Sequence, residues 1–474
     1  MVWIWKNNTE PSAERRDKMH LSAYFGLLSF AVAAVASPAG HHEPHKPNSI
    51  KNLKSHIKNV VILVMENRSF DNILGGQKTH GLDNPIHNGP FCNPFNLTDP
   101  SQGQACSGPR SFDSVINDPD HAIYGNNIQF YGDYTPDNEA IASGKLKAHN
   151  KGFAHEQMRL YADEANKTDL VKQVMHYYTE EQVPVLTSLV KNYLTFNHWH
   201  SDIPGNTNPN RAALTSGTSH GHGLNDAGFE NHELPVRSIF QQLTETNHTW
   251  VNYVDPDGGT GPDAGFYSWT YETGNEDKIV PLANFYTDAA AGALPELTYI
   301  NPSCCGVGTT SMHPSGLISD GETFIKSVYD ALRTGPQWDN TLFILTFDES
   351  GGFHDHVPAP LAPRPDNLTF TLKTPNGENY TFPFDRLGGR IPTLLISPWV
   401  GKNAVEQKGT NEQGKKVSYS ATSILRTLGY LWDFEPFTPR VEAAASFEHL
   451  IRSKARKDTL ENLPEPEPFK KVKV

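Results

Sequence analysis

Acidic and amide side chains follow two apolar segments of this 474-residue chain at the point where each segment ends. One apolar run stops on Glu66 and Asn67, and a second stops on Asp348 and Glu349. Three carboxylates that are packed together repel one another and favour a bound cation. Carboxylate and amide oxygens suit hard or borderline divalent ions. These four residues therefore predict a site for one or more divalent metal ions, whose identity the pattern leaves open.

A polar turn rich in Asn, Pro and Gly follows a third short apolar segment and contains Thr207. A Thr hydroxyl is a poor nucleophile alone, but a neighbouring metal ion favours its alkoxide form. Arg211 and the N–H groups of a helix that begins near Asn210 can hold an anion such as phosphate, although Arg211 can also simply cap the turn. Candidate proton donors to a leaving oxygen are His313, His354 and His356. Together these residues predict phosphoryl transfer through a covalent phospho-threonine.

Each of these segments also has a purely structural interpretation. Asn67 or Ser69 can cap a helix that has Asp71 in its first turn. The sequence Asp-Glu-Ser followed by two glycines is also typical of an ordinary exit from a strand into a turn. Three such segments in one chain favour a shared site over three unrelated turns.

Strand and helix patterns alternate from Ile57 onwards, which predicts an α/β fold with a mainly parallel sheet covered by helices. The predicted strands are Asn59–Met65, Tyr193–Asn197, Trp250–Tyr253, Leu297–Ile300, Thr341–Phe347 and Thr393–Ile396. The predicted helices lie within residues 168–192 (two, separated near Pro184), 319–334 (capped by Ser319 or Asp320) and 418–434. Open parallel sheets bind ligands at the carboxyl ends of their strands, so the site residues are expected at one rim of the sheet.

Composition divides the chain into four predicted parts. These are an N-terminal extension with a signal peptide (1–36), a polar linker (37–55), one catalytic domain (56–450) and a charged, Pro-rich mobile tail (451–474). Within the domain, the loop-rich residues 76–155 are predicted to form an insertion over the sheet edge.

The apolar segment near the N-terminus is shorter than the ~20 residues of a bilayer span. It ends in the small-x-small sequence Ala34-Val35-Ala36, so Met19–Ala36 is predicted to be a signal peptide, with an uncleaved anchor as the alternative. We therefore expect a secreted, extracellular protein.

Secretion permits disulfides, and the four cysteines allow three pairings. Cys92 and Cys106 share one polar loop and are the simplest pair, whereas the adjacent Cys304 and Cys305 can bridge each other, pair elsewhere or stay reduced. Candidate glycosylation sites are Asn96, Asn166, Asn247, Asn367 and Asn379. The formal sequon at Asn67 is expected to stay unglycosylated, because a metal ligand cannot carry a glycan. The net charge of −13 argues against a nucleic-acid partner.

Four segments resemble the phosphoesterase family that contains non-haemolytic phospholipases C and respiratory-burst-inhibiting acid phosphatases. They are "VVILVMENRSFDNILG", "SDIPGNTNPNRAALTSGT", "SMHPSGLISDGETFIKSVYDAL" and "TLFILTFDESGGFHDHVPAP", and they lie in the family order over roughly residues 57–360. The likeness extends to about residue 435 through "GGRIPTLLISPWV". The resemblance implies a three-layer α/β/α sandwich of the alkaline-phosphatase type.

The resemblance also assigns roles residue by residue. It implies the metal ligands Glu66, Asn67, Asp348 and Glu349, the nucleophile Thr207, the histidines His313 and His356, and by a looser match His121. The turn reads "PGNTNPNR" where many members have Gly-Pro-Thr-Asp-Pro-Asn-Arg, so the nucleophile is retained but its neighbour loses a charge.

These patterns predict a secreted, metal-dependent phosphoric-ester hydrolase. A phospholipase C acting on glycerophospholipids is the first expectation, and a broad-specificity acid phosphatase acting on small phosphoesters is the alternative. An inactive secreted binding protein is a third possibility, which the intact nucleophile and ligand positions disfavour. At most transient contact with a membrane surface is expected, because the chain ends soon after the catalytic core. The oligomeric state is left open.

Overall fold

The computed structural model describes residues 45–255 and 261–469. The chain divides into two units, residues 1–39 and 40–474, and all described residues belong to the second. The predicted signal peptide therefore lies outside the described residues, and its assignment stays a prediction.

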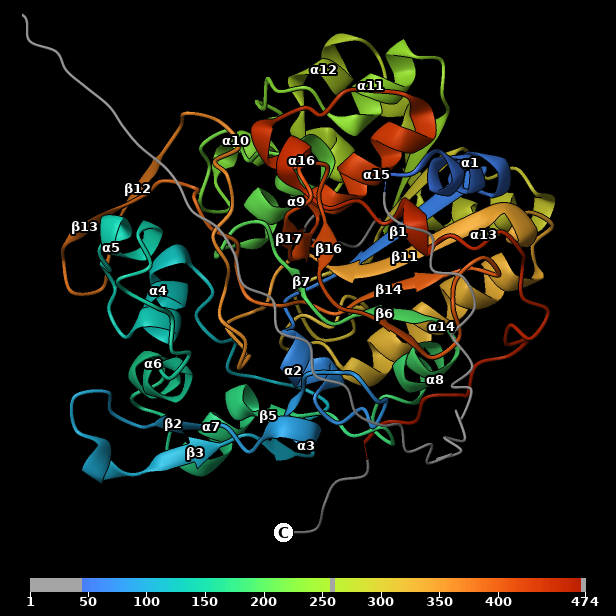
Figure 1. The fold of residues 1–474 in the computed structure, drawn as a ribbon. Helices are drawn as coiled ribbons and strands as arrows, with labels where there is room; N and C mark the ends of the chain where they lie inside the picture. The colour runs from blue at the N-terminus through green and yellow to red at the C-terminus, as the bar shows by residue number, and fades with distance from the viewer. Residues whose placement is uncertain (1–44, 256–260, 470–474) are drawn as a thin grey trace, which may run out of the picture. The chain divides into compact units, whose positions relative to one another are not determined.

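The core of the second unit is an eight-stranded sheet (Figure 1). Its strands, in spatial order, are β15 (Ala404–Glu406), β6 (Leu194–Phe196), β14 (Thr393–Ile396), β11 (Thr341–Phe347), β1 (Asn59–Met65), β10 (Leu297–Asn301), β8 (Trp250–Val254) and β9 (Ile279–Pro281). Strand β14 is antiparallel to both of its neighbours, and the other neighbouring pairs are parallel. The prediction of a mainly parallel sheet is confirmed.

Strands β1 and β11 lie side by side in the middle of this sheet. Every residue of both strands is buried, and their apolar runs are typical of parallel strands that are covered on both faces. Their register pairs Met65 with Phe347, so the two strands end at the same level. The residues that follow, Glu66 and Asp348, therefore leave the sheet next to each other.

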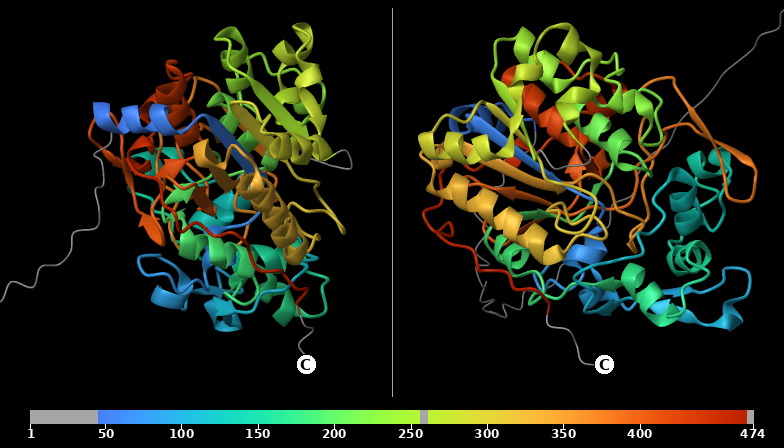
Figure 2. Two further views of the ribbon diagram at one scale, coloured as in Figure 1. Left: turned by 90° about the vertical axis from the view of Figure 1, so that its right-hand side faces the viewer. Right: turned by 180° about the vertical axis from the view of Figure 1, so that it is seen from behind.

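Two groups of helices cover opposite faces of the sheet (Figures 1 and 2). One group contains α8 (Pro184–Asn192), α13 (Leu282–Ala291) and α14 (Ile318–Thr334). The other contains α1 (Pro47–His56), α9 (Thr207–Ser216), α11 (Ile239–Glu245) and α15 (Thr422–Trp432). The arrangement is the predicted three-layer α/β/α sandwich.

One buried carboxylate joins two helices of the first group. The first residue of α8 is Pro184, and the residue before it offers no capping side chain. Glu322 of α14 supplies the cap instead, because its carboxylate accepts hydrogen bonds from the backbone N–H groups of Val185 (2.6 Å) and Leu186 (3.0 Å). The predicted cap of α14 itself is wrong: the helix begins after Leu317 without a capping side chain, and Ser319 bonds to Asp113.

The predicted insertion at 76–155 forms a small lobe with a hydrophobic core of its own. Its elements include β2 (Cys92–Pro94), β3 (Gln104–Cys106), α4 (Ile123–Tyr131) and α5 (Asn138–Ala142), which pack with α6 (Phe153–Leu160) and α7 (Lys167–Met175). The predicted Cys92–Cys106 disulfide joins β2 to β3.

The remaining elements are short. They are α2 (Phe70–Leu74), α3 (Pro85–Asn88), β4 (Gly108–Pro109), β5 (His176–Tyr177), β7 (Trp199–His200), α10 (Ala227–Glu230), α12 (Ser268–Glu272), β12 (Phe370–Lys373), β13 (Asn379–Phe382), β16 (Gly409–Thr410), β17 (Lys416–Val417), β18 (Tyr419–Ser420) and α16 (Pro439–Ala443), with single 3₁₀ turns between some of them. No helix within 45–255 or 261–469 has the length and apolar character needed to cross a membrane.

Two predicted flexible segments are ordered where the structure describes them. The second half of the predicted linker forms α1, which buries Leu53. In the predicted mobile tail, Leu463 is buried and the hydroxyl of Tyr329 donates to the carbonyl of Leu460 at 2.7 Å. Buried apolar residues and hydrogen bonds together hold the described parts of both segments against the domain.

Candidate active site

The four predicted metal ligands come together where β1 and β11 end. Glu66, Asn67, Asp348 and Glu349 are all buried. The backbone N–H of Asn67 donates to Asp348 Oδ1 at 3.1 Å, and the N–H of Arg68 donates to the carbonyl of Glu349 at 3.1 Å. We call these four residues, together with Arg211 and Asp263, the rim cluster.

Gly351 and Gly352 allow the segment after Glu349 to pack directly against Asn67 and against the loop that contains Asp120. Asn67 and Gly351 both have left-handed backbone conformations, with φ of 60° and 65°. A Cβ atom on Gly351 would lie 2.1 Å from Asn67 Oδ1, and one on Gly352 would lie 2.3 Å from the carbonyl oxygen of Asp120. The two glycines therefore make room for the ligand amide and for the loop that carries His121.

The rim cluster has an excess of negative charge in a buried place. Burial raises the pKa of Asp348 to about 7, Arg211 opposes this change, and the carboxylate of Glu66 adds to it. Burial also raises the pKa of Glu349 well above its ordinary value, with His121 opposing and Asp348 adding. A cation at this position would remove the mutual repulsion of the carboxylates.

The residues present fit a divalent metal ion. Asn67 Oδ1 and Glu349 Oε1 are buried acceptor atoms without a hydrogen-bond partner among the described residues. Buried polar atoms normally have a partner, and amide and carboxylate oxygens are acceptors, so a cation is a partner that suits both atoms. Glu66, Asn67, Asp348 and Glu349 would hold the ion, and their oxygen donors favour a hard or borderline one.

Thr207 is the first residue of α9 and is buried. The helix begins three residues earlier than predicted, and the side chain of Asn210 bonds to the turn before it. The Asn210 side chain accepts from the N–H of Ile203 (2.9 Å) and donates to three carbonyl oxygens of residues 203–206. These bonds hold the nucleophile turn in one conformation.

Arg211 lies one helical turn after Thr207 and differs from its predicted role as a phosphate clamp. Its guanidinium is fully buried: Nε donates to Asp348 Oδ2 at 3.0 Å, and Nη2 donates to the carbonyl of Val64 at 3.2 Å and lies 3.7 Å from Glu66 Oε1. Arg211 therefore ties α9 to the metal-ligand carboxylates.

Asp263 is a member of the rim cluster that the sequence did not indicate. Its Oδ2 lies 3.6 Å from Arg211 Nη1 and accepts from the hydroxyl of Tyr299 at 2.6 Å. Its Oδ1 accepts from the amide of Asn301 at 2.8 Å. Asp263 begins a one-turn 3₁₀ helix in a Gly-rich stretch and does not directly follow an apolar strand, as the predicted metal ligands do. Only its contacts in the folded chain show that it belongs to the rim cluster.

A group of two histidines and one aspartate adjoins the rim cluster. Asp118 Oδ2 lies 3.8 Å from both His121 Nδ1 and His313 Nε2, and His121 Nε2 lies 3.5 Å from the amide nitrogen of Asn67. Burial lowers the pKa of His121, but Glu349 and Asp118 outweigh burial and raise the pKa to about 9. Burial lowers the pKa of His313, with Asp118 opposing. The pair thus offers one charged and one neutral imidazole.

The other two predicted histidines are held by structural contacts. His356 Nδ1 lies 2.7 Å from Asp71 Oδ2, and Nε2 lies 2.9 Å from Asp83 Oδ1, so both ring nitrogens are engaged. His354 is buried against the ring of Phe153, and burial lowers its pKa to about 4. Their predicted part in proton transfer is not supported by this geometry.

Arg390 completes the contacts of His356. Its Nη2 donates to Asp71 Oδ1 and its Nε to Asp355 Oδ1, both at 2.9 Å. We call Asp71, Asp83, Asp355, His356 and Arg390 the Arg390 cluster. The sequence did not indicate Arg390, which precedes β14 in an unremarkable polar segment.

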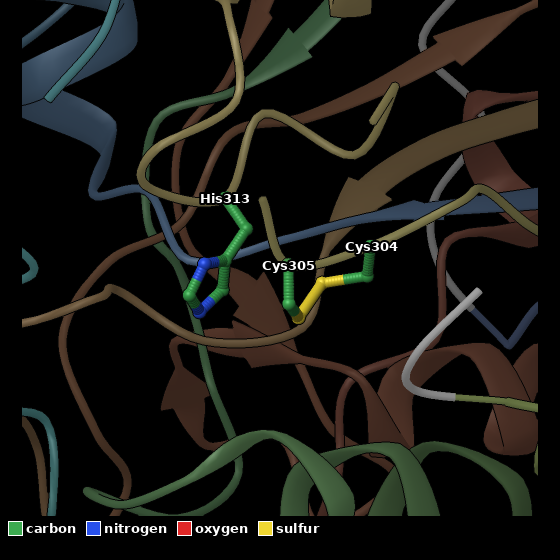
Figure 3. Close-up of side chains that lie close together, drawn as sticks. All are labelled: Cys304, Cys305 and His313. Atoms are coloured by element: carbon green, nitrogen blue, oxygen red, sulfur yellow. A yellow bond between two sulfur atoms is a disulfide. The ribbon is translucent and has the colours of Figure 1, made fainter. Parts of the chain in front are cut away.

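The adjacent cysteines form a disulfide with each other beside His313 (Figure 3). Cys305 Sγ lies 3.8 Å from Glu66 Oε2. Of the three arrangements that the sequence left open, the structure has the vicinal one, and it lies at the edge of the rim cluster.

Comparison with known proteins identifies the family of this chain. The profile of the Phosphoesterase family matches residues 57–435. Non-specific phospholipase C6 of Arabidopsis thaliana is 32% identical and covers 97% of this chain and 83% of its own length. Non-specific phospholipase C4 of the same plant is 33% identical (86% and 74%), and phospholipase C A of Mycobacterium tuberculosis is 25% identical (72% and 68%).

Solved structures show a more distant and partial likeness. A phosphonate monoester hydrolase from Silicibacter pomeroyi superposes with a TM-score of 0.32 at 13% identity, covering 59% of this chain and 73% of its own. The match over most of the chain to the family profile, and the identity to the plant relatives, are the stronger findings. This chain belongs to the Phosphoesterase family, whose members hydrolyse phosphoric ester bonds.

Proposed function

We propose that this chain is a phospholipase C that cleaves glycerophospholipids through a phospho-Thr207 intermediate. The observation that carries the proposal is the placement of Thr207 and Arg211 one turn apart on α9, with Arg211 bonded to Asp348. Residues at i and i+4 share one face of a helix, so Thr207 lies on the face of α9 that is turned toward the rim cluster. The names of the plant and bacterial relatives support the choice of lipid as substrate.

Catalysis divides into two displacements at phosphorus. Thr207 Oγ1 gives its proton to solvent and attacks phosphorus, the bond from phosphorus to the diacylglycerol oxygen breaks, and that oxygen takes a proton from an imidazole. Water then gives one proton to an imidazole and attacks the phospho-threonine, the bond from phosphorus to Thr207 Oγ1 breaks, and the phosphorylated head group leaves. Thr207 Oγ1 takes a proton back from solvent. A divalent ion held by the rim cluster would favour the Thr207 alkoxide and take charge from the phosphoryl oxygens.

His121 is the better candidate for the first proton transfer. Its raised pKa keeps it protonated near neutral pH, and it lies against the ligand Asn67. His313, whose pKa is lowered, is suited to accept a proton from the attacking water in the second displacement. Asp118 lies between the two rings and orients both.

We also propose that the protein is secreted and glycosylated. The five sequon asparagines outside the site are half-buried or exposed, as a glycan requires. Asn67, in contrast, is fully buried beside Asp348 and cannot accept a glycan.

The intermediate is tested with two substitutions of the nucleophile. Thr207→Ser should retain measurable turnover, whereas Thr207→Ala should lose it while binding as much metal as the wild type. Acid quenching of the wild type during turnover, followed by mass spectrometry of the peptide that contains Thr207, should show a phosphoryl-containing adduct. A Thr207→Ala variant with wild-type turnover would refute the assignment.

The substrate is tested by offering lipid and monoester side by side. The protein is incubated with phosphatidylcholine or phosphatidylglycerol vesicles and, separately, with p-nitrophenyl phosphate. Release of diacylglycerol supports the phospholipase C. Release of phosphate from the monoester alone, without diacylglycerol, would assign the protein as the alternative acid phosphatase.

A further inference from the structure

The vicinal disulfide lies in a loop that is anchored to the end of β1. The N–H groups of Thr310 and Ser311 donate to the carbonyl of Ser303 at 3.2 and 3.0 Å, which closes the base of the loop. The carbonyl of Ser311 in turn accepts from the N–H of Glu66 at 3.0 Å. The two cysteines are therefore held next to the metal ligands by backbone contacts that do not depend on the disulfide.

The tip of the same loop has room to rearrange. Cys305 is exposed, and the side chain of Val307 is 86% exposed. A Cβ atom placed on Gly306 or Gly308 would meet no atom of the described residues within 4 Å. A reductant can therefore reach the disulfide, and the two sulfur atoms can separate after reduction without displacing the loop base.

His313 completes a potential metal site with the two cysteines. One ring nitrogen of His313 and the two Sγ atoms all lie within 4.8 Å of one another (Figure 3). The ring also belongs to a second group of this kind, with Asp118 and His121. The same imidazole thus stands between a pair of sulfur atoms and the proposed proton-transfer residues.

We propose that Cys304, Cys305 and His313 form a reducible site for a thiophilic divalent ion such as Zn²⁺ or Cd²⁺. The site is closed while the disulfide is intact and opens when a dithiol reduces it. Ion binding then draws His313 away from Asp118 and His121 and stops turnover. The proposed ion binding depends only on these three side chains. The proposed loss of turnover also depends on the proposed function, in which His313 takes part in proton transfer.

Reduction of the Cys304–Cys305 disulfide takes two electrons, which a dithiol supplies. A dithiol supplies two electrons and two protons, the Cys304–Cys305 bond breaks, and the dithiol becomes a cyclic disulfide. The two thiols lose their protons when the ion binds. Zinc–sulfur and zinc–nitrogen bonds of about 2.3 and 2.0–2.1 Å are compatible with ligand atoms this close together. Thiolates prefer softer ions than the oxygen ligands of the rim cluster do, so the two sites select different metals.

Binding is tested in a chain that retains only the vicinal disulfide. A Cys92→Ser/Cys106→Ser variant is reduced with dithiothreitol, freed of the reductant without air, and titrated with Cd²⁺. The ultraviolet charge-transfer absorbance of the cadmium–thiolate bond should appear and saturate at one ion per chain. It should be absent from the unreduced protein and from a variant that also carries Cys304→Ser/Cys305→Ser. A reduced protein with no such absorbance, or equal absorbance without these cysteines, would overturn the proposal.

Turnover measured on the same samples tests the connection to His313. Reduced protein should lose at least about tenfold in turnover when one equivalent of Cd²⁺ binds, and the loss should reverse when oxidation expels the ion. The Cys304→Ser/Cys305→Ser variant should keep its turnover under the same treatment, with unchanged far-ultraviolet circular dichroism. Cadmium–thiolate absorbance without a loss of turnover would refute the effect on catalysis. Full turnover of a His313→Ala variant that retains its rim-cluster metal and receives no Cd²⁺ would instead refute the proposed role of His313 in catalysis.

Discussion

The rim cluster and the Arg390 cluster both include residues from the same two strand exits, but they differ in how fully their carboxylates are paired. Glu66 and Asp71 lie five positions apart after β1, and Asp348 and Asp355 lie seven apart after β11. The first cluster has four carboxylates and one cation, Arg211, and two of its acceptor atoms have no partner among the described residues. The second has three carboxylates and two cations, and each of these carboxylates forms an ion pair with Arg390 or His356.

This difference separates a binding site from a structural ion network. Buried carboxylates that are matched by cations and hydrogen bonds hold segments together, as Arg390 holds the segments that follow β1 and β11. Buried carboxylates in excess destabilise the metal-free fold and favour a bound cation. The same residue type therefore serves stability in one cluster and function in the other.

The largest effect on stability is expected for Arg390→Met. It would leave Asp355 buried without its cation and Asp71 with His356 as its remaining one, which costs about 3–5 kcal/mol in the free energy of unfolding. Chemical denaturation measures this change. Lys402→Met, which breaks an exposed ion pair with Asp458, is the control and should cost about 0–1 kcal/mol. Equal effects of the two substitutions would contradict the structural role of Arg390.

Glu349→Gln, in contrast to Arg390→Met, should impair activity and metal binding without lowering the stability of the metal-free protein. Loss of one ligand charge is expected to lower kcat/KM by on the order of 10²–10³-fold and to weaken metal binding. The metal-free protein should be no less stable than the wild type, because the substitution relieves repulsion with Asp348. Steady-state kinetics, metal analysis and denaturation of the metal-free protein check these outcomes. A loss of stability like that of Arg390→Met would place Glu349 in a balanced network instead.

Gly351→Ala should affect both function and stability. The left-handed backbone costs a non-glycine residue roughly 1–2 kcal/mol, and the added Cβ also collides with Asn67 Oδ1. Gly377→Ala is the matched control, because Gly377 has φ of 87° but open space around it. Only the change at 351 should lower metal affinity. Equal metal affinity in the two variants would mean that the close approach to Asn67 does not position the ligand.

The smallest effect is a pH dependence that arises from His356. Burial lowers its pKa, but the hydrogen bond and charge of Asp71 outweigh burial and raise the pKa from 6.5 to about 9. Its stabilising contribution is therefore complete below pH 6.5 and is lost as the pH rises toward 9. Denaturation midpoints across this range should fall for the wild type and fall less for His356→Gln. Parallel curves for the two proteins would exclude His356 as the titrating group.

The sequence predicted the fold, and the meeting of the proposed metal ligands, because both depend on local patterns. The apolar runs of β1 and β11 show where each strand ends, and parallel pairing brings the polar residues after them to one rim. Their roles as metal ligands, and that of Thr207 as nucleophile, stay predictions. The family resemblance added His121, which no local pattern indicates.

The residues that sequence reasoning missed or misassigned act through distant partners. Asp118 and Asp263 come from irregular segments, and only the folded chain brings them to His313 and Arg211. A buried arginine and a phosphate-binding arginine have the same sequence pattern, so Arg211 could not be assigned before its three carboxylate neighbours were known. The described parts of the predicted linker and tail are ordered by specific contacts, such as the burial of Leu53 and the bond from Tyr329 to Leu460, that composition does not show.

The reversed direction of β14 has a practical consequence for modifying this protein. Because β14 runs against β11, Arg390 just before it lies near the carboxyl end of β11, whereas Ser397 just after it donates to the carbonyl of Thr341 at the opposite end of that strand. A fluorescent label or affinity tag inserted beyond β14 would thus be separated from the rim cluster by the length of the strands. The same insertion ahead of the strand would disrupt the Arg390 cluster.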